Sequence, residues 1–204
     1  MRRTILILSA TALVLSACST PTTNGTPTPS TGGSSPSPSN SASLPPGVPK
    51  VEHPIDVTRF KQAPCTALTD AQAKELLGPT TESKQRDGAA GPACRWTVPS
   101  SLNPRIDVVF GSGPDGGTAS VYAAKEKAYK LVEPLEPIDG YPVTAYGVTD
   151  RRAEGDCSVS LGISDTQTIG IALLQSEANI GEKDPCTAAR EGAVRVLTTI
   201  RGGN

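Results

Sequence analysis

The sequence CSVSLGISDTQTIGIAL, residues 157–173, decides the fold class. In its first part, apolar side chains alternate with serine or glycine, at Cys157, Val159, Leu161 and Ile163. A polar turn at residues 164–167 follows, and Ile169, Ile171 and Leu173 then continue the alternation. This period of two is typical of strands with one buried face, so the stretch predicts an antiparallel hairpin.

Further elements follow from the pattern on either side of this hairpin. Period-two or strand-like stretches predict strands at residues 93–98, 105–110 and 143–146, the first two as an antiparallel pair. Apolar residues at helical spacing predict a helix from Thr118 to about Val132, and residues 133–142 are interpreted as a proline-rich bend. The expected fold class is α+β, an antiparallel sheet of about five strands packed by two to three helices and held by two disulfides.

Two helix starts carry capping signals. Thr69 can accept from the free amides of a helix that ends at Gly78-Pro79, and Gln72 lies three positions later, as a capping box requires. Asp184-Pro185 supplies a cap and a proline at the first helical position of the last helix. The core-facing stripe of that helix is Ala189, Ala193, Val196, Leu197 and Ile200.

The N-terminus has the pattern of an export signal. Met1-Arg2-Arg3 is positively charged, and residues 4–14 form an apolar stretch too short for an ordinary membrane-spanning helix. LSAC at residues 15–18 resembles the bacterial lipobox, in which the cysteine takes a lipid. Residues 1–18 are therefore predicted to be a lipoprotein signal peptide, with Cys18 as the lipidation site.

Composition divides the remaining chain into two parts. Residues 19–53 are mostly Ser, Thr, Pro, Gly and Asn, so a disordered tether is expected there. Residues 54–204 are expected to form a disulfide-stabilised domain outside the cytoplasm. The chain has 19 basic and 20 acidic residues, scattered along its length, which gives no footprint for nucleic acid. A monomer on the outer face of the plasma membrane is expected.

Four cysteines follow Cys18, at positions 65, 94, 157 and 186. Cys65 and Cys186 each lie in the tetrapeptide Pro-Cys-Thr-Ala at a predicted helix start, whereas Cys94 and Cys157 lie in predicted strands. The favoured pairing is Cys65 with Cys94 and Cys157 with Cys186, because each bridge would fasten a helix start to the sheet. Pairing Cys65 with Cys186 and Cys94 with Cys157 stays open as the alternative.

Three segments carry a resemblance to a family. They are residues 56–69, which end in Pro-Cys-Thr-Ala-Leu-Thr, the strand around Cys94-Arg95-Trp96, and the helix start Asp184-Pro185-Cys186. Together they resemble the secreted actinobacterial lipoproteins classed as a domain of unknown function, of the mycobacterial LprB and LprC type. The resemblance implies an actinobacterial cell envelope, and it implies no activity and no catalytic residues.

Motifs for metal or nucleotide chemistry are weak. Residues 111–116, GSGPDG, fit G-x-G-x-x-G, but the neighbouring strands read as hairpins, so a glycine-rich turn is favoured. No C-x-x-C pair exists, and the single histidine, His53, is interpreted as a solvated linker residue. No metal and no cofactor are expected.

Carboxylates and aromatic residues are the remaining candidates for a catalytic or ligand-binding site. Asp150, Glu154 and Asp156 are clustered near Arg151 and Arg152, and a solvated turn is favoured over a pair of catalytic acids. Trp96, next to Cys94, is expected to pack in the core.

The expected function is a non-enzymatic binding or interaction module of the cell envelope, held by its lipid. An envelope protein, a lipid or a glycan is the expected partner. The alternatives are a carboxylate-dependent hydrolase that acts on cell-wall polymer and a purely structural envelope component.

Overall fold

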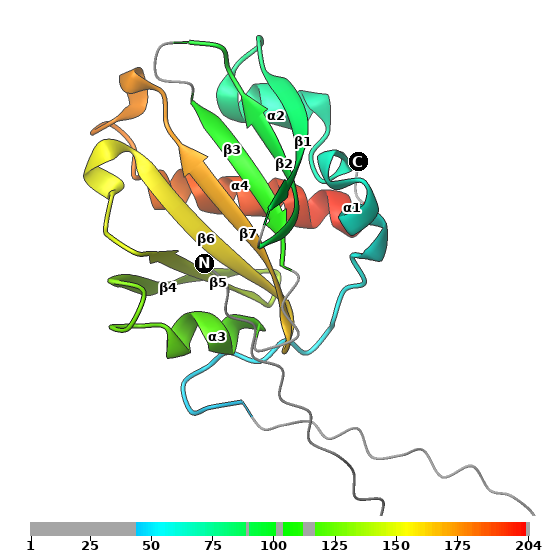
Figure 1. Cartoon of the computed structure of the whole chain (residues 1–204), viewed down its shortest axis with the longest axis vertical. Coiled ribbons are helices and arrows are strands. Elements are labelled where there is room, and N and C mark those ends of the chain that lie inside the picture. The colour runs from blue at the N-terminus through cyan, green and yellow to red at the C-terminus, as the bar shows by residue number, and fades with distance from the viewer. Residues whose placement is uncertain (1–43, 89, 101–103, 112–116, 203–204) are drawn as a thin grey trace, which may run out of the picture. The chain divides into compact units, whose positions relative to one another are not determined.

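The computed structural model of the chain describes residues 44–88, 90–100, 104–111 and 117–202 (Figure 1). The predicted signal peptide with Cys18, most of the predicted tether and most of the glycine-rich motif lie outside these residues. Within the described residues, all strands join one antiparallel sheet with the order β1-β2-β3-β7-β6-β5-β4. The predicted α+β class is confirmed, with seven strands where about five were expected.

The strands are β1 (Glu82–Gly88), β2 (Gly91–Thr97), β3 (Arg105–Phe110), β4 (Leu131–Ile138), β5 (Tyr141–Gly147), β6 (Asp156–Ser164) and β7 (Gln167–Leu174). The helices are α1 (Thr58–Gln62), α2 (Asp70–Leu77), α3 (Gly117–Ala123) and α4 (Pro185–Ile200), with short 3-10 turns η1 (Pro64–Thr66), η2 (Arg152–Glu154) and η3 (Glu177–Asn179). The sheet twists strongly, so that β4 and β5 run across the direction of β1 to β3 (Figure 1).

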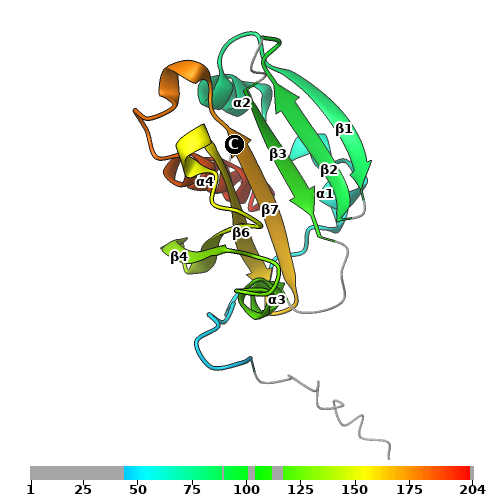
Figure 2. The ribbon, with the colours of Figure 1, turned by 60° about the vertical axis from the view of Figure 1, so that its left-hand side comes forward.

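The helices α1, α2 and α4 cover one face of the sheet (Figures 1 and 2). The ring of Phe60 in α1 stacks on Phe110 of β3, with 6.2 Å between ring centroids. At Gly192 of α4, an added Cβ would lie 2.6 Å from Cδ1 of Ile106, so the helix packs in close contact with the sheet. The predicted core stripe of α4 is buried along its whole length.

Both predicted helix starts are confirmed. Thr69 accepts from the backbone N–H of Gln72, and the Gln72 side chain accepts from the backbone N–H of Thr69. Asp184 accepts from the backbone N–H of Thr187 at the start of α4, at 2.7 Å. The Thr199 hydroxyl then donates to Oε1 of Gln72 at 2.9 Å, which ties the end of α4 to the start of α2.

The predicted disulfide pairing is confirmed, and the alternative is excluded. Cys65 bonds to Cys94 and joins η1 to β2, while Cys157 bonds to Cys186 and joins β6 to α4. Each bridge links the helical layer to the sheet. Disulfides persist in oxidising compartments, so both bridges indicate a protein outside the cytoplasm.

The predicted helix from Thr118 to Val132 is wrong. Helix α3 ends at Ala123, and Glu126 has a left-handed backbone with φ of 60°. Leu131 and Val132 belong to β4, where they pair with Gly147 and Tyr146 of β5. The apolar residues at helical spacing therefore belong partly to a short helix and partly to an edge strand. For Leu131 and Val132, pairing with β5 outweighs the local helix propensity.

The bend predicted at residues 133–142 is also wrong. Residues of this range form most of β4 and the start of β5, joined by Asp139 and Gly140, which both have positive φ. Two central residues with positive φ make the tight turn that matches the twist of a hairpin. Pro134 and Pro137 are tolerated because β4 is the edge of the sheet, where a missing N–H breaks no ladder.

The face of β1 to β3 that points away from α1, α2 and α4 carries charged side chains, and we call it the open face. In β2 and β3 its residues alternate with buried residues of the core, whereas β1 is exposed on both faces. The charged residues of the open face are Glu82, Lys84 and Arg86 in β1, Arg95 in β2, and Arg105 and Asp107 in β3. Helix α3 packs on this same side of the sheet but over β5 to β7, where Thr118 lies against Gly162.

The packed part of the chain reaches back to Val51, three residues before the predicted start of the domain. Val51 is 3% exposed, and its backbone N–H donates to Asp165 in the β6–β7 turn at 3.0 Å. The backbone N–H of Ile55 donates to the carbonyl of Ile163. Between them, His53 is exposed and its carbonyl accepts from the Tyr141 hydroxyl.

Candidate functional site

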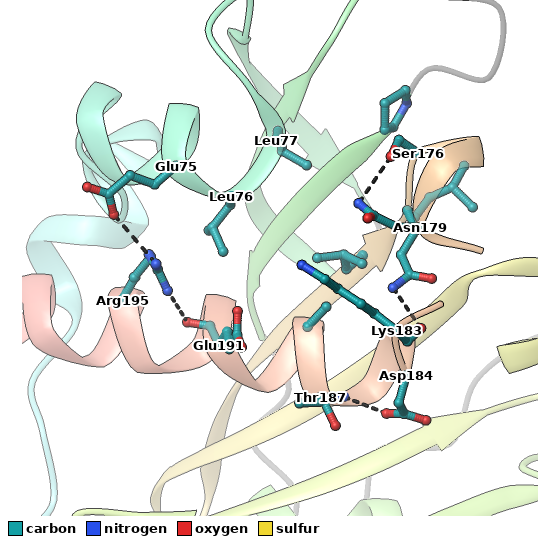
Figure 3. A pocket seen from close by; sticks show the side chains of 15 residues that line it. Glu75, Leu76, Leu77, Ser176, Asn179, Lys183, Asp184, Thr187, Glu191 and Arg195 are labelled. Carbon is teal, nitrogen blue, oxygen red and sulfur yellow. Dashed lines mark hydrogen bonds and ion pairs between the residues drawn. The ribbon is translucent and has the colours of Figure 1, made fainter. Parts of the chain in front are cut away.

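A cleft of about 370 Å³ lies between α2, the first half of α4 and the loop that follows β7 (Figure 3). Its volume falls within the range of roughly 300–1,000 Å³ that is usual for small-molecule sites. The lining residues are Glu75, Leu76, Leu77, Pro104, Leu173, Leu174, Gln175, Ser176, Asn179, Lys183, Asp184, Thr187, Ala188, Glu191 and Arg195.

The floor of the cleft is apolar and is continuous with the core. Leu173, at the end of β7, is 4% exposed and belongs to the core, while Leu76, Leu77 and Ala188 are half-buried and pack against it. The capping box of α2 and the Asp184 cap of α4 fix the two helices that hold these side chains. The floor therefore lies on rigid elements.

Gln175 forms the polar wall of the cleft. It is 5% exposed, and its Nε2 donates to the carbonyl of Lys183 at 3.1 Å, which fastens the start of the 175–184 loop to its end. Its backbone N–H donates to the carbonyl of Gly155. Among the described residues, Oε1 of Gln175 has no hydrogen-bond partner. A buried acceptor of this kind carries a desolvation cost until it is paired.

Charges of both signs stand at the rim. Nη2 of Arg195 lies 3.5 Å from Oε2 of Glu75 at one end of the cleft, and Lys183 extends its ammonium across the cleft in the direction of α2 (Figure 3). Glu75, Asp184 and Glu191 are all exposed. A general acid needs a buried setting that keeps its proton near neutral pH, and these three carboxylates are exposed.

The carboxylates singled out from the sequence lie elsewhere, around η2. Asp150 accepts from Arg152 at 2.6 Å, and Arg152 also bonds Glu133 of β4 at 3.1 Å. Asp156 lies 3.4 Å from Arg151. The hydrogen bond from the Arg152 side chain lowers the pKa of Asp150, the opposite of the shift that a general acid requires. The carboxylates of this cluster form ion pairs with neighbouring arginines, which is typical of a solvated turn.

The other residues considered from the sequence contribute nothing to the cleft. Trp96 is 1% exposed and belongs to the core, as expected. In the described part of the chain, no three His, Cys, Asp or Glu side chains are grouped closely enough to hold a metal ion. No helix in that part is long and apolar enough to cross a membrane.

The cleft itself has almost no signature in the sequence. Its walls come from residues far apart in the chain, since Glu75 and Arg195 are separated by 120 positions. Lys183 and Gln175 lie in a loop between two predicted elements and fit no motif. The signal of the cleft that the sequence does contain is the pair of helix caps, Thr69 and Asp184, because they fix where α2 and α4 begin.

Comparison with known proteins gives a family but no function. A family model described as "Protein of unknown function (DUF3558)" matches residues 13–199. No curated protein and no solved structure matches the chain. The matched range runs from the apolar stretch before Cys18 into the last helix, so it includes all five cysteines.

Proposed function

The chain belongs to the DUF3558 family of proteins of unknown function, and from its geometry we propose that it is a lipid-anchored binding protein of the cell envelope. It takes a small amphipathic ligand into the cleft between α2 and α4 and catalyses no reaction on it. The observation that carries the proposal is the cleft of about 370 Å³, which has an apolar floor and a rim that carries charges of both signs.

The chemistry of the lining defines the ligand. Leu76, Leu77 and Ala188 favour an apolar group of modest size, since burial of apolar surface contributes about 25 cal/mol per Å². Lys183, which no described carboxylate pairs, favours an anionic or strongly polar end.

Two observations support a location at the membrane. The two disulfides indicate an extracytoplasmic domain. The sequence LSAC at residues 15–18, after a short apolar stretch, supports a lipid on Cys18 as the anchor to the outer face of the plasma membrane, in an actinobacterial envelope. The proline- and serine-rich residues 19–43 then serve as the spacer between the anchor and the domain.

We expect Thr187→Trp to abolish ligand binding, because Thr187 is an exposed residue of α4 that lines the cleft and an indole there fills it. The measurement is native mass spectrometry of the full lipoprotein extracted from the envelope of the bacterium that produces it. The wild-type protein is expected to carry a bound small molecule, and Thr187→Trp is expected to carry none.

Thr198→Trp is the matched control, since Thr198 is an exposed threonine on the same helix that does not line the cleft. It should retain the bound molecule. A wild-type protein without any bound small molecule would contradict the proposed function, and it would favour a purely structural envelope component. Equal binding by Thr187→Trp would show that the ligand lies elsewhere.

Replacing Cys18 with alanine should leave the precursor uncleaved and without lipid, because the thiol is the acceptor and acylation precedes cleavage at a lipobox. Intact-mass measurement of the membrane fraction checks this result, with Ser19→Ala as the control that keeps the thiol. A mature, lipid-free protein cut before position 18 would show that the segment is an ordinary signal peptide.

A further inference from the structure

The open face holds a second concavity, on the opposite side of the sheet from α1, α2 and α4. Its volume is about 520 Å³, and its lining residues are Glu82, Ser83, Lys84, Arg86, Arg95 and Thr97. The register places Lys84 directly opposite Arg95, with Asp107 next in the same row across the sheet. Arg86 lies two residues further along β1, on the same face as Lys84.

Positive charge dominates this face. Lys84, Arg86, Arg95 and Arg105 stand against two carboxylates, Glu82 and Asp107. Asp107 is already engaged by two of the cations: its oxygens lie 2.7 and 3.0 Å from Nε and Nη2 of Arg95, and 3.7 Å from Nε of Arg105. No described carboxylate forms an ion pair with Lys84 or Arg86.

Asp107 also orients Arg95. The ion pair with Asp107 uses two of the three guanidinium nitrogens of Arg95, Nε and Nη2. The third, Nη1, has no hydrogen bond with the described residues. A guanidinium carries five N–H donors, so Arg95 keeps donors for a ligand while its plane is held in place. The bidentate pair thus fixes a donor group at the floor of the concavity.

Lys84 lies directly opposite Arg95 in the register. Like charges in this position repel each other, but the ion pair with Asp107 already offsets the charge of Arg95. The cations of this row that keep no described carboxylate as a partner are Lys84 and its neighbour Arg86.

We propose that Lys84, Arg86 and Arg95 bind a phosphate group, at a second site that is separate from the cleft between α2 and α4. Adjacent strands lie about 4.8 Å apart and alternate residues of one strand about 6.7 Å apart, so a single phosphate reaches cations on both strands. Arginine pairs with phosphate through its planar fork, and lysine adds a point charge. Glu82 stands at the other end of the concavity and repels an anion, which directs the phosphate towards Arg86.

The edge position of β1 decides what can carry the phosphate. No other strand of the described chain lies beyond β1, and residues 82–87 are all exposed. One side of the concavity is therefore open, so the phosphate can belong to a lipid headgroup or to a free phosphate compound. Both sources would be recognised through the phosphate group, and they differ in the part of the ligand that lies outside the concavity.

Isothermal titration of the full lipoprotein in a neutral detergent tests the site. The probes are sodium pyrophosphate, dihexanoylphosphatidylglycerol and, as a zwitterionic reference, dihexanoylphosphatidylcholine. Saturable binding of pyrophosphate or of the anionic lipid is expected. The double variant Lys84→Gln/Arg86→Gln should weaken it about tenfold or more, because hydrogen bonds between charged partners are worth at least that factor.

The control variant is Lys125→Gln/Lys127→Gln, which removes the same charge from two exposed lysines outside the open face. It should bind as the wild type does. Tighter binding of phosphatidylglycerol than of pyrophosphate identifies a lipid headgroup as the source, and the reverse identifies a free phosphate compound. Binding of neither anionic probe, or equal loss in both double variants, would overturn the proposal. Far-UV circular dichroism confirms that the variants are folded, and the Thr187→Trp experiment reports on the cleft independently.

Discussion

Replacement of both Cys157 and Cys186 by alanine should lower the free energy of unfolding by about 3.6 kcal/mol, the value that chain entropy gives for a loop closed over 29 residues. The bridge joins β6, an inner strand of the sheet, to the start of α4, and both cysteines are 3% exposed. Since small domains are stable by only about 5–15 kcal/mol, the loss is a large share of the total. Urea denaturation followed by the fluorescence of Trp96 measures it.

The double variant Cys65→Ala/Cys94→Ala gives the comparison, because its loop has the same separation of 29 residues. Chain entropy alone predicts an equal loss. Cys65 is half-buried but Cys94 is fully buried, so the loss of packing should be similar for the two double variants. A loss below about 1 kcal/mol for Cys157→Ala/Cys186→Ala would show that the bridge contributes little to stability.

Trp96→Ala should lower the free energy of unfolding by about 3–5 kcal/mol, the range for truncating a large aromatic side chain in a core. Trp96 is 1% exposed and lies opposite Ile106 in the sheet, beneath the helical layer. The core has few aromatic residues, with one Trp and two Phe in the chain, so neighbouring side chains cannot refill its volume. Because no tryptophan remains in the variant, circular dichroism in urea is the measurement.

Val148→Ala provides the matched control for truncation. Val148 is 66% exposed, so its replacement should change stability by no more than about 0.5 kcal/mol. The variant Trp96→Phe should show an intermediate loss, because it keeps an aromatic ring and removes part of the volume. If Trp96→Ala were as stable as Val148→Ala, the assignment of Trp96 to the core would be wrong.

The strands that the sequence predicts are the five inner strands of the sheet, β2, β3, β5, β6 and β7. Alternation in β6 and β7 follows directly from a core on one side, and β2 and β3 carry enough apolar residues to be recognised. The two strands that escape prediction are the two edges of the sheet. The segment ESKQRDG in β1 has no apolar residue, and LVEPLEPI in β4 contains two prolines.

Edge strands differ in composition for a physical reason. Charged residues and prolines on an edge prevent pairing with other chains, so the features that protect β1 and β4 also remove the strand pattern. One signal for the β4–β5 hairpin was present: Asp139-Gly140 is a dipeptide typical of tight hairpin turns.

The disulfides and helix caps were predictable because they depend on local sequence and on a small number of combinations. Neither the cleft nor the open face could be predicted from the sequence. The cleft depends on where α2 meets α4, a contact between Gln72 and Thr199 across 127 positions. The open face depends on the register that places Lys84 opposite Arg95, and β1 was not recognised as a strand.

The attachment of Val51 to the β6–β7 turn determines which end of the domain bears the force when the N-terminal segment is under tension. Val51 bonds Asp165 in that turn, whereas the cleft lies beside Leu173 and Leu174 at the far end of β7. The eight residues of β7 span roughly 25 Å. Tension on the N-terminal segment therefore enters the domain about one strand length from the cleft, so the side chains that line the cleft lie away from the point where the force is applied.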